Sequence, residues 1–256
     1  MEIKDISFSY QDKVKRLHHI EASIPKGKIT TIIGPNGCGK STLLGVLTNN
    51  FQPQTGQVIL DGQLINKYKP KELAKKLGVV HQQNSAPNDL TVEKLVFYGR
   101  LPHKNSFAPQ TEKDEEMVEW ALKCTGLYEK RDYPIDSLSG GEQQRAWIAM
   151  ALAQDTPYLV LDEPTSNLDI YYQYEILELV KRLCDEHGLT IVMVLHDINQ
   201  AIQYSHNIIA MKQGRIIQKG DPKQVVTKEF IHEVYGVHVV VKNDPETGMY
   251  VVPLGI

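Results

Sequence analysis

Short apolar runs recur along the chain and predict β-strands. Residues 3–10 alternate between apolar and polar side chains, and residues 28–33 are rich in β-branched ones. Residues 57–60 form a strand pattern that leads into a turn, and residues 77–80 form a short apolar strand pattern. Two further runs are continuously apolar, residues 158–161 and 189–195. Such runs are typical of strands buried on both faces of a parallel sheet.

Other segments have the 3.6-residue period of amphipathic helices. Residues 40–47 place three leucines on one face and end before a polar run. Residues 171–187 repeat apolar side chains on one face, and Gly188 follows as a helix stop. After residue 207 the pattern predicts two strands joined by a turn at 213–214, then a helix over 227–235 and a hairpin around 243–248.

The stretch from about residue 91 to 136 differs from its α/β flanks and predicts a helical insertion. Apolar side chains recur at i, i+3, i+4 and i+7 from Met117 to Cys124, which is a helical stripe. Thr91 and Thr111 are the expected N-caps of two helices in this region. There is no internal repeat and no low-complexity linker, so we expect one compact unit with a helical lobe.

The composition of the chain excludes several classes of protein. With 256 residues, 41% hydrophobic residues and a net charge of −3, it is typical of a globular protein, with no electrostatic case for nucleic acid. No secretory signal or bilayer-spanning apolar run is present in the sequence. Cys38, Cys124 and Cys184 lack metal-ligand spacing and suit a reducing compartment. We therefore expect a cytoplasmic protein whose membrane association, if any, comes from a partner.

The first segment with recognisable chemistry fits the pattern GxxxxGK[ST] between a predicted strand and a predicted helix. Its residues are Gly34, Pro35, Asn36, Gly37, Cys38, Gly39, Lys40 and Ser41, and we add Thr42 to the expected nucleotide contacts. Glycines allow successive backbone N–H groups to face phosphate oxygens. Lys40 is expected to bind the β- and γ-phosphates, and the Ser41 hydroxyl to bind Mg²⁺. The segment predicts ATP and Mg²⁺ as cofactors.

A second chemical feature is the pair of carboxylates that ends the apolar run 158–161. Asp162 is expected to hold Mg²⁺ through water, and Glu163 to polarise the water that attacks the nucleotide. A general base of this kind contributes about 10²–10⁴-fold to a rate. Together with the phosphate loop, the pair predicts ATP hydrolysis.

A third feature is the segment Leu-Ser-Gly-Gly-Glu-Gln that opens a predicted helix at residue 139. Ser139 with Glu142 three residues later is a capping box. Gly140 and Gly141 disfavour a helix, and they would be explained by a ligand that approaches the backbone closely. The serine hydroxyl and the N–H groups of this helix end would then form a second phosphate-binding surface.

In these motifs the sequence resembles the nucleotide-binding subunits of ABC transporters, over nearly its whole length. Residues 138–143 resemble the signature motif of that family, and residues 166–169, which include Asp169, resemble its D-loop. Gln82 is similar to the Q-loop glutamine, with Gln83 as the less suitable alternative. His196 resembles the switch histidine, and Tyr10 the aromatic residue that stacks on adenine.

The resemblance implies an α/β fold: a P-loop NTPase core with a mixed sheet, an N-terminal antiparallel β part and an inserted α-helical subdomain. Residues 1–256 would form one nucleotide-binding domain, with the helical subdomain at about 84–137 and a C-terminal tail at about 222–256. Glu163, His196 and Gln82 would be catalytic, and Gln82 would also bind the metal.

The resemblance also implies a head-to-tail dimer, formed with a second copy or with a homologous ATPase subunit. Each ATP would then lie between the phosphate loop of one subunit and the signature segment of the other, with Ser139, Gly140, Gly141, Glu142 and Asp169 as further nucleotide contacts. Membrane permease subunits would be direct partners, a substrate-binding protein an indirect one, and nucleic acid none. The protein would lie on the cytoplasmic face of the membrane as a peripheral subunit.

Within the family, four segments are similar to importers of iron chelates (siderophores or haem) and cobalamin: residues 98–103, 144–150, 230–236 and 244–248. The leading hypothesis is therefore an ATPase that drives uptake of an iron chelate. A different cargo, such as cobalamin, is an alternative within the transporters.

Two other classes are weighed against a transporter. A soluble ABC ATPase would be supported by two fused cassettes or long coiled coils, and the sequence has neither. A switch GTPase or a kinase is disfavoured by the signature motif and by the lack of an Asn-Lys-x-Asp motif. A separate hypothesis concerns Cys38: it is either a small filler of the phosphate loop or a thiol whose modification blocks ATP.

Overall fold

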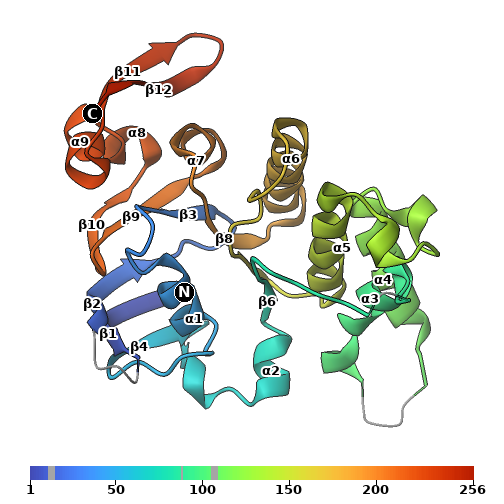
Figure 1. Ribbon diagram of the computed structural model, residues 1–256. Helices are drawn as coiled ribbons and strands as arrows, with labels where there is room; N and C mark the ends of the chain where they lie inside the picture. The colour runs from blue at the N-terminus through green and yellow to red at the C-terminus, as the bar shows by residue number, and fades with distance from the viewer. Residues whose placement is uncertain (11–14, 88, 105–108) are drawn as a thin grey trace. The chain divides into compact units, whose positions relative to one another are not determined.

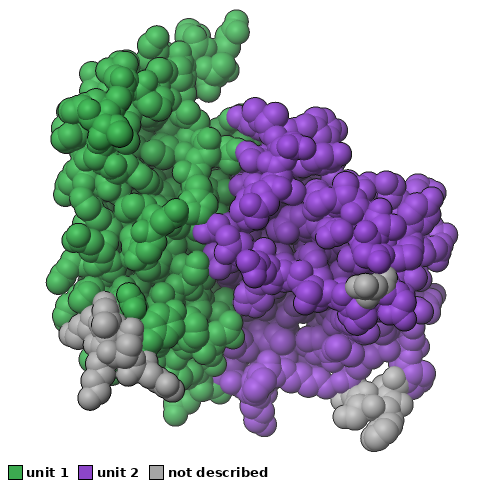
Figure 2. Space-filling view, viewed as in Figure 1, with its two compact units in different colours: residues 1–67, 190–256 green, residues 68–189 purple. Residues whose placement is uncertain are grey.

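The computed structural model describes residues 1–10, 15–87, 89–104 and 109–256 (Figure 1). The chain divides into two compact units, coloured separately in Figure 2. Unit 1 comprises Met1–Lys67 and Thr190–Ile256, and unit 2 comprises Tyr68–Leu189. Among the described residues, no helix is long and apolar enough to cross a membrane.

Unit 1 begins with an antiparallel sheet in the order β2-β1-β4-β5. Its strands are β1 (Glu2–Ser9), β2 (Lys15–Ser23), β4 (Thr55–Leu60) and β5 (Gln63–Leu64). The apolar side chains of β1 and β2 are buried on one face, so the predicted N-terminal antiparallel part is confirmed.

Strand β2 is absent from the sequence-based prediction, and a bulge explains why. Its buried residues Leu17 and Ile20 are three positions apart, since His19 has a left-handed backbone with φ 50°. Asp5 in β1 has the same φ of 50°, and its carboxylate accepts a 2.7 Å hydrogen bond from the His19 ring. The extra residue of a bulge interrupts strict alternation, which is the signal that identifies a strand in sequence.

The second sheet of unit 1 includes the strand order β10-β9-β3-β8. Its strands are β3 (Ile29–Ile33), β8 (Thr190–Val194), β9 (Asn207–Lys212) and β10 (Arg215–Gly220). Strand β3 is parallel to both β8 and β9, and every residue of β3 and β8 is buried. The predicted turn before β10 is confirmed, with positive φ at Gln213 and Gly214, as a tight hairpin turn requires.

The remaining elements of unit 1 are short helices and a hairpin. They are α1 (Lys40–Leu47), η1 (Ile65–Lys67), α7 (Ile198–Tyr204), α8 (Pro222–Val225), α9 (Lys228–Tyr235), β11 (His238–Asp244) and β12 (Gly248–Gly255). The bounds predicted for α1 are confirmed. Helix α7 was not predicted, although Asp197 caps it by accepting a hydrogen bond from the Gln200 amide.

Unit 2 contains two parallel strands and most of the long helices. The strands are β6 (Leu77–Val80) and β7 (Tyr158–Leu161). The helices are α2 (Pro70–Ala74), α3 (Val92–Tyr98), η2 (Leu101–His103), α4 (Glu112–Cys124), η3 (Tyr128–Lys130), η4 (Ile135–Ser137), α5 (Gly140–Ala153) and α6 (Ile170–His187). Thr91 and Thr111 cap α3 and α4 as predicted, and Gly188 ends α6 in a left-handed conformation.

A buried ion pair ties the helices of unit 2 together. Arg100 Nε donates to Asp114 Oδ1 over 2.9 Å, and the two side chains are only 2% and 5% exposed. Arg100 Nη1 also donates to the carbonyl of Ala153 at the end of α5 over 2.7 Å. Asp114 accepts further hydrogen bonds from the backbone and hydroxyl of Thr111. Because a charge without partners is costly to bury, these contacts fix the packing of α3, α4 and α5.

Candidate nucleotide-binding site

The predicted phosphate loop connects β3 to α1 in unit 1, and two of its glycines are required by packing. A Cβ at Gly34 would lie 2.2 Å from the Met211 carbonyl oxygen, and one at Gly39 would lie 3.0 Å from the carbonyl oxygen of Arg16. Gly37 differs, since no atom lies within 4 Å of its added Cβ, while its φ of 75° is left-handed. Protein contacts thus explain Gly34 and Gly39, and Gly37 faces open space where a ligand has room.

Helix α1 starts in a way that suits a bound anion. Its N-cap residue Gly39 offers no side-chain hydrogen bond, and its first turn has no acidic residue. Lys40 is buried, and its Nζ donates to the carbonyl oxygens of Gly34 over 2.9 Å and Pro35 over 3.2 Å. An uncapped helix N-terminus beside a lysine attracts phosphate, so this loop fits the nucleotide phosphates predicted from sequence.

Tyr10 lies at the first turn of the same helix. Its hydroxyl and the Thr42 hydroxyl are 3.1 Å apart, within hydrogen-bonding distance. Its ring makes edge-on contacts with Phe8 and Phe51, at centroid distances of 5.0 and 5.5 Å. With 40% of the residue exposed, the ring has surface left for a planar ligand.

His196 follows β8 and is exposed. Ile32 of β3 pairs with Val194 of β8, and the Leu195 amide donates to the Ile32 carbonyl. Because β3 and β8 are parallel, their carboxyl ends lie at the same edge of the sheet. The phosphate loop and His196 therefore leave the sheet of unit 1 at one edge, as the sequence motif requires.

In unit 2, the parallel strands β6 and β7 bring two predicted catalytic residues together. Gln82 Nε2 donates to Glu163 Oε2 over 2.6 Å, so the structure favours Gln82 over Gln83 as the functional glutamine. Asp162 directly follows β7, and its amide donates to the Val80 carbonyl. Glu163 has a left-handed backbone with φ 52°, a conformation that costs about 1–3 kcal/mol in non-glycine residues. Such strain is typical of functional positions.

The signature segment begins α5 as a complete capping box. Ser139 Oγ accepts from the Glu142 amide, and Glu142 Oε2 accepts from the Ser139 amide over 3.0 Å. A Cβ at Gly141 would lie 2.7 Å from the Tyr172 ring, whereas one at Gly140 would meet only Leu168 at 3.6 Å. Packing against an aromatic ring therefore explains Gly141 without a ligand. Gly140 remains exposed and open to a close approach.

The Glu142 carboxylate is held ionised. The pKa of Glu142 falls to about 2, mainly because of a hydrogen bond from Lys130. Burial raises this pKa, and the hydrogen bonds from Ser139 lower it further. The sequence analysis missed Lys130, since nothing in its neighbourhood indicates a contact with a residue twelve positions away.

Asp169 is the N-cap residue of α6, is exposed, and makes no side-chain cap hydrogen bond. Its carbonyl accepts from the Gln173 amide, and the Gln173 side chain donates to the Leu168 carbonyl over 2.8 Å. These bonds hold the predicted D-loop at the start of the helix and leave the Asp169 carboxylate at the surface of unit 2.

The C-terminal tail contributes a residue to the phosphate loop that the sequence analysis also missed. Tyr235, at the end of α9, lies beside Gly34 and Cys38. Burial and the Cys38 thiol raise the pKa of the Tyr235 phenol far above its ordinary value, against a smaller effect of the Gly34 backbone. The phenol is therefore neutral at physiological pH and packs against the loop.

The described residues contain no group of three or more His, Cys, Asp or Glu side chains arranged to hold a metal ion. Ser41 of unit 1 and Gln82 and Asp162 of unit 2 stay the predicted Mg²⁺ ligands, and each carries an oxygen of the kind that this ion prefers.

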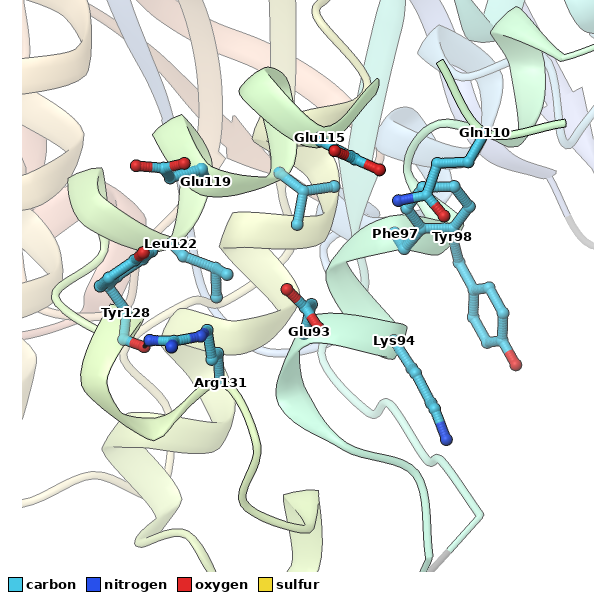
Figure 3. Close-up of a pocket in the computed structure, with 11 residues that line it drawn as sticks. Glu93, Lys94, Phe97, Tyr98, Gln110, Glu115, Glu119, Leu122, Tyr128 and Arg131 are labelled. Carbon is cyan, nitrogen blue, oxygen red and sulfur yellow. Dashed lines mark hydrogen bonds between the residues drawn. The ribbon is translucent and has the colours of Figure 1, made fainter. Parts of the chain in front are cut away.

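A separate hollow of about 680 Å³ lies in the helical part of unit 2 and contains none of the predicted nucleotide contacts (Figure 3). Figure 3 shows Tyr128 and Arg131 on one side of the view and Lys94 and Tyr98 on the other. Its lining is mostly from α3 and α4 and combines aromatic and apolar side chains with three glutamates, Glu93, Glu115 and Glu119, and two basic residues, Lys94 and Arg131.

Comparison with known proteins decides the family. Residues 17–166 match the family model described as ABC transporter. The chain is 44% identical to the iron(3+)-hydroxamate import ATP-binding protein FhuC of Bacillus subtilis (strain 168), over 96% of this chain and 91% of FhuC. This chain belongs to the ABC transporter ATP-binding family. As an ABC ATPase, it binds a nucleotide and hydrolyses ATP.

Other relatives and solved structures support the same family assignment. The ferric enterobactin transport ATP-binding protein FepC of Escherichia coli (strain K12) is 47% identical over 93% of this chain and 88% of FepC. Among solved structures, an inward-facing ABC transporter assigned to the metal-chelate type matches with a TM-score of 0.86 and 28% identity, covering 99% of this chain and 96% of that one. The dimeric ABC transporter cassette MJ0796 matches with a TM-score of 0.75 and 32% identity, covering 86% and 98%. The predicted fold class, a mixed α/β ABC cassette with a helical part, is confirmed.

Proposed function

We propose that this ABC ATPase drives uptake of an iron chelate, a ferric siderophore or haem, through a membrane permease. The observation that carries the proposal is the identity of 44% to FhuC and 47% to FepC over more than nine-tenths of this chain. FhuC is named for the import of iron(3+)-hydroxamate and FepC for the transport of ferric enterobactin, and the similarity extends beyond the motifs that all ABC ATPases share.

For the nucleotide, we propose roles that follow the geometry of each unit. In unit 1, residues 34–42 bind the phosphates, Tyr10 stacks on adenine and His196 orients the γ-phosphate or the attacking water. In unit 2, Glu163 polarises that water. Mg²⁺ supplies charge to the phosphates when bound, and Ser41, Gln82 and Asp162 hold it directly or through water.

The 2.6 Å hydrogen bond between Gln82 and Glu163 supports this division of labour. It orients the Glu163 carboxylate and leaves the oxygen of the Gln82 amide for a metal ion or water. Gln82 lies just after β6, so a shift of this segment would change the position of the Glu163 carboxylate to which it is hydrogen-bonded.

We further propose a head-to-tail dimer in which Ser139, Gly140, Gly141, Glu142 and Asp169 of one copy complete the ATP site of another. The exposed start of α5 supports it, because a serine hydroxyl and helix N–H groups at the surface suit a phosphate. The similarity to a dimeric cassette also supports it. A homologous ATPase subunit is the alternative partner.

For the permease, we propose that the hollow of Figure 3 receives a cytoplasmic segment of the membrane subunit. Its aromatic walls offer apolar area, and its three glutamates outnumber Lys94 and Arg131, which favours a basic group on the partner. The protein would then be peripheral on the cytoplasmic membrane face, with the helical subdomain near 84–137 as the transmitting part and a substrate-binding protein as an indirect partner. Nucleic acid is not among the proposed partners.

Two experiments test the proposal at different levels. In purified protein, Glu163→Gln is expected to lower steady-state ATP hydrolysis at least about 100-fold while ATP binding persists, because the water loses its base. The exposed Glu186→Gln on α6 removes the same charge and is expected to retain full activity. Substantial turnover by Glu163→Gln would remove Glu163 from the mechanism.

In cells, a strain lacking this gene and any redundant ATPase is compared for uptake of labelled ferric siderophores, haem and cobalamin. We expect loss of iron-chelate uptake, restored by the wild-type gene and not by Glu163→Gln. Loss of cobalamin uptake alone would reassign the cargo, and unaltered uptake of all three would count against an importer of this group.

A further inference from the structure

We propose that Lys130 is a positioning residue of the signature segment: it neutralises Glu142 so that Ser139 and the start of α5 can donate hydrogen bonds to the γ-phosphate of an ATP bound to a second copy of this chain. The inference rests on the proposed dimer and adds a residue that none of the sequence motifs contains.

A continuous set of hydrogen bonds joins Lys130 to Ser139. Lys130, at the end of η3, donates from Nζ to Glu142 Oε1 over 2.5 Å. The other carboxylate oxygen, Oε2, accepts from the Ser139 amide and from the Ser139 hydroxyl, both over 3.0 Å. One carboxylate thus links the lysine to the serine that is expected to contact phosphate.

Glu142 is more buried than Lys130 and Ser139, the two residues that it contacts. The Glu142 side chain is 17% exposed and the Lys130 side chain 43%, while Ser139 is exposed. A carboxylate that is mostly out of water and already ionised attracts its cation more strongly than a surface pair does. The arrangement holds Glu142 in one orientation and keeps the Ser139 hydroxyl at the surface of unit 2.

Charge gives this contact a functional consequence. Without Lys130, Glu142 would present an uncompensated negative charge within hydrogen-bonding distance of Ser139, where the proposed ligand brings several negative charges. The capping box by itself is therefore unfavourable for binding phosphate, and the ammonium group of Lys130 cancels that effect. The neighbouring Arg131 is directed elsewhere: its Nη1 donates to the Tyr128 carbonyl and its guanidinium lies over the Tyr128 ring.

A purely structural role for Lys130 is the competing hypothesis, since the ion pair also ties η3 to α5. The two hypotheses differ in which measured quantity changes when Lys130 is replaced. A structural tie affects the unfolding temperature of unit 2, whereas a positioning role affects the ATP concentration needed to form the dimer.

The test uses Glu163→Gln as the parent, because a hydrolysis-deficient chain accumulates the ATP-bound dimer. Lys130→Met keeps the length and the apolar stem of the side chain and removes its charge. Lys123→Met is the matched control: Lys123 pairs with Glu119 on α4, both are exposed, and the charge change is identical. Dimer formation is followed by light scattering while Mg·ATP is titrated, and thermal unfolding is measured in parallel.

We expect Lys130→Met to raise the half-saturating ATP concentration about 10- to 100-fold, Lys130→Arg to restore it to within about threefold, and Lys123→Met to leave it unchanged. In chains with Glu163 intact, Lys130→Met should raise KM and leave kcat within about twofold. An unchanged ATP requirement, or an equal effect of Lys123→Met, would overturn the inference. So would a lower unfolding temperature with a normal ATP requirement. If the parent itself forms no dimer with Mg·ATP, the dimer proposal fails, and the inference about Lys130 fails with it.

Discussion

The buried ion pair between Arg100 and Asp114 contributes to the stability of unit 2. Both belong to stretches with ordinary helical patterning, yet together they fill a position that water cannot reach. Burial raises the pKa of Asp114, but hydrogen bonds from Thr111 and Arg100 outweigh it and bring the value to about 2 from an ordinary 3.8. The Asp114 carboxylate is therefore ionised at physiological pH.

We predict that Asp114→Asn lowers the free energy of unfolding of unit 2 by about 3–5 kcal/mol at pH 7, because Arg100 is left buried without a counter-charge. Both tryptophans, Trp120 and Trp147, lie in unit 2, so their fluorescence in a urea titration reports this unit. Asp132→Asn, at an exposed position, is the control and should be neutral.

The pH dependence of this difference has a definite sign. The folded pKa of Asp114 is below its unfolded value, so its contribution is fully present above about pH 4. It is lost as the pH falls from about 4 towards 2, and the gap between wild type and Asp114→Asn should close over that range. A gap that persists unchanged to pH 2 would contradict the role assigned to the carboxylate.

Cys38 is the second residue whose setting decides its chemistry. It is 4% exposed, and burial raises the pKa of its thiol against the opposing effect of Lys40. A neutral, covered thiol is a poor nucleophile. This setting favours the filler hypothesis over the thiol-switch hypothesis.

We predict that iodoacetamide labels Cys38 at least about tenfold more slowly in the folded protein than in urea at pH 7.5, as measured by mass spectrometry. The folded rate should rise with pH, because deprotonation is what limits it. Rapid labelling with loss of ATPase activity, absent in Cys38→Ser, would instead establish the thiol switch.

At the scale of elements, the start of α5 contains two adjacent glycines in different surroundings. Gly141 is required because Tyr172 lies against it, and Gly140 has no such neighbour. Packing against Tyr172 therefore explains Gly141, whereas a ligand contact at Gly140 stays a prediction.

We predict that Gly141→Ala destabilises unit 2 by about 1–3 kcal/mol, because a Cβ cannot fit beside the Tyr172 ring. Gly140→Ala should change stability by no more than about 0.5 kcal/mol, yet raise the ATP requirement for dimer formation about tenfold. Urea unfolding and light scattering give the two quantities for each variant. An unaffected ATP requirement in Gly140→Ala would mean that no ligand approaches that backbone.

Helix α9 makes a comparable point for the tail of unit 1. Its residues Phe230, Ile231 and Val234 are buried, and Tyr235 at its end lies beside the phosphate loop. The end of this helix thus packs against the predicted phosphate loop.

At the scale of the whole molecule, the proposed dimer makes activity a property of two chains. Because each ATP would need residues of both copies, hydrolysis should follow the concentration of dimer. Under the proposed function, cargo selection would lie with other subunits, and this chain would supply the energy from ATP.

We predict that specific ATPase activity rises with protein concentration over about two to three decades and then reaches a plateau, as mass action requires. Removal of Mg²⁺ with EDTA should abolish hydrolysis at every concentration. A specific activity that does not depend on concentration, with light scattering showing monomers throughout, would exclude the dimer as the active form.

The sequence was most informative where the physics is local. Residues 77–80 and 158–161 are strands with the predicted bounds, since a continuous apolar run can be satisfied only by burial on both sides. Capping residues such as Thr111 could be read from spacing alone. Strand β2 could not, because its bulge at His19 shifts the alternation and depends on pairing with β1.

The motifs of the candidate site were likewise readable, since few roles besides phosphate binding suit a glycine-rich loop between a strand and a helix. What only the tertiary structure decided are contacts between residues far apart along the chain. Gln82 meets Glu163 across 81 positions, Lys130 meets Glu142 across twelve, and Tyr235 reaches the phosphate loop. The sequence determined most of the elements and identified the loop expected to bind phosphate, because these depend on neighbours within a few residues. Packing determined which side chains orient that chemistry, because it brings together residues whose spacing in sequence contains no information about their distance in space.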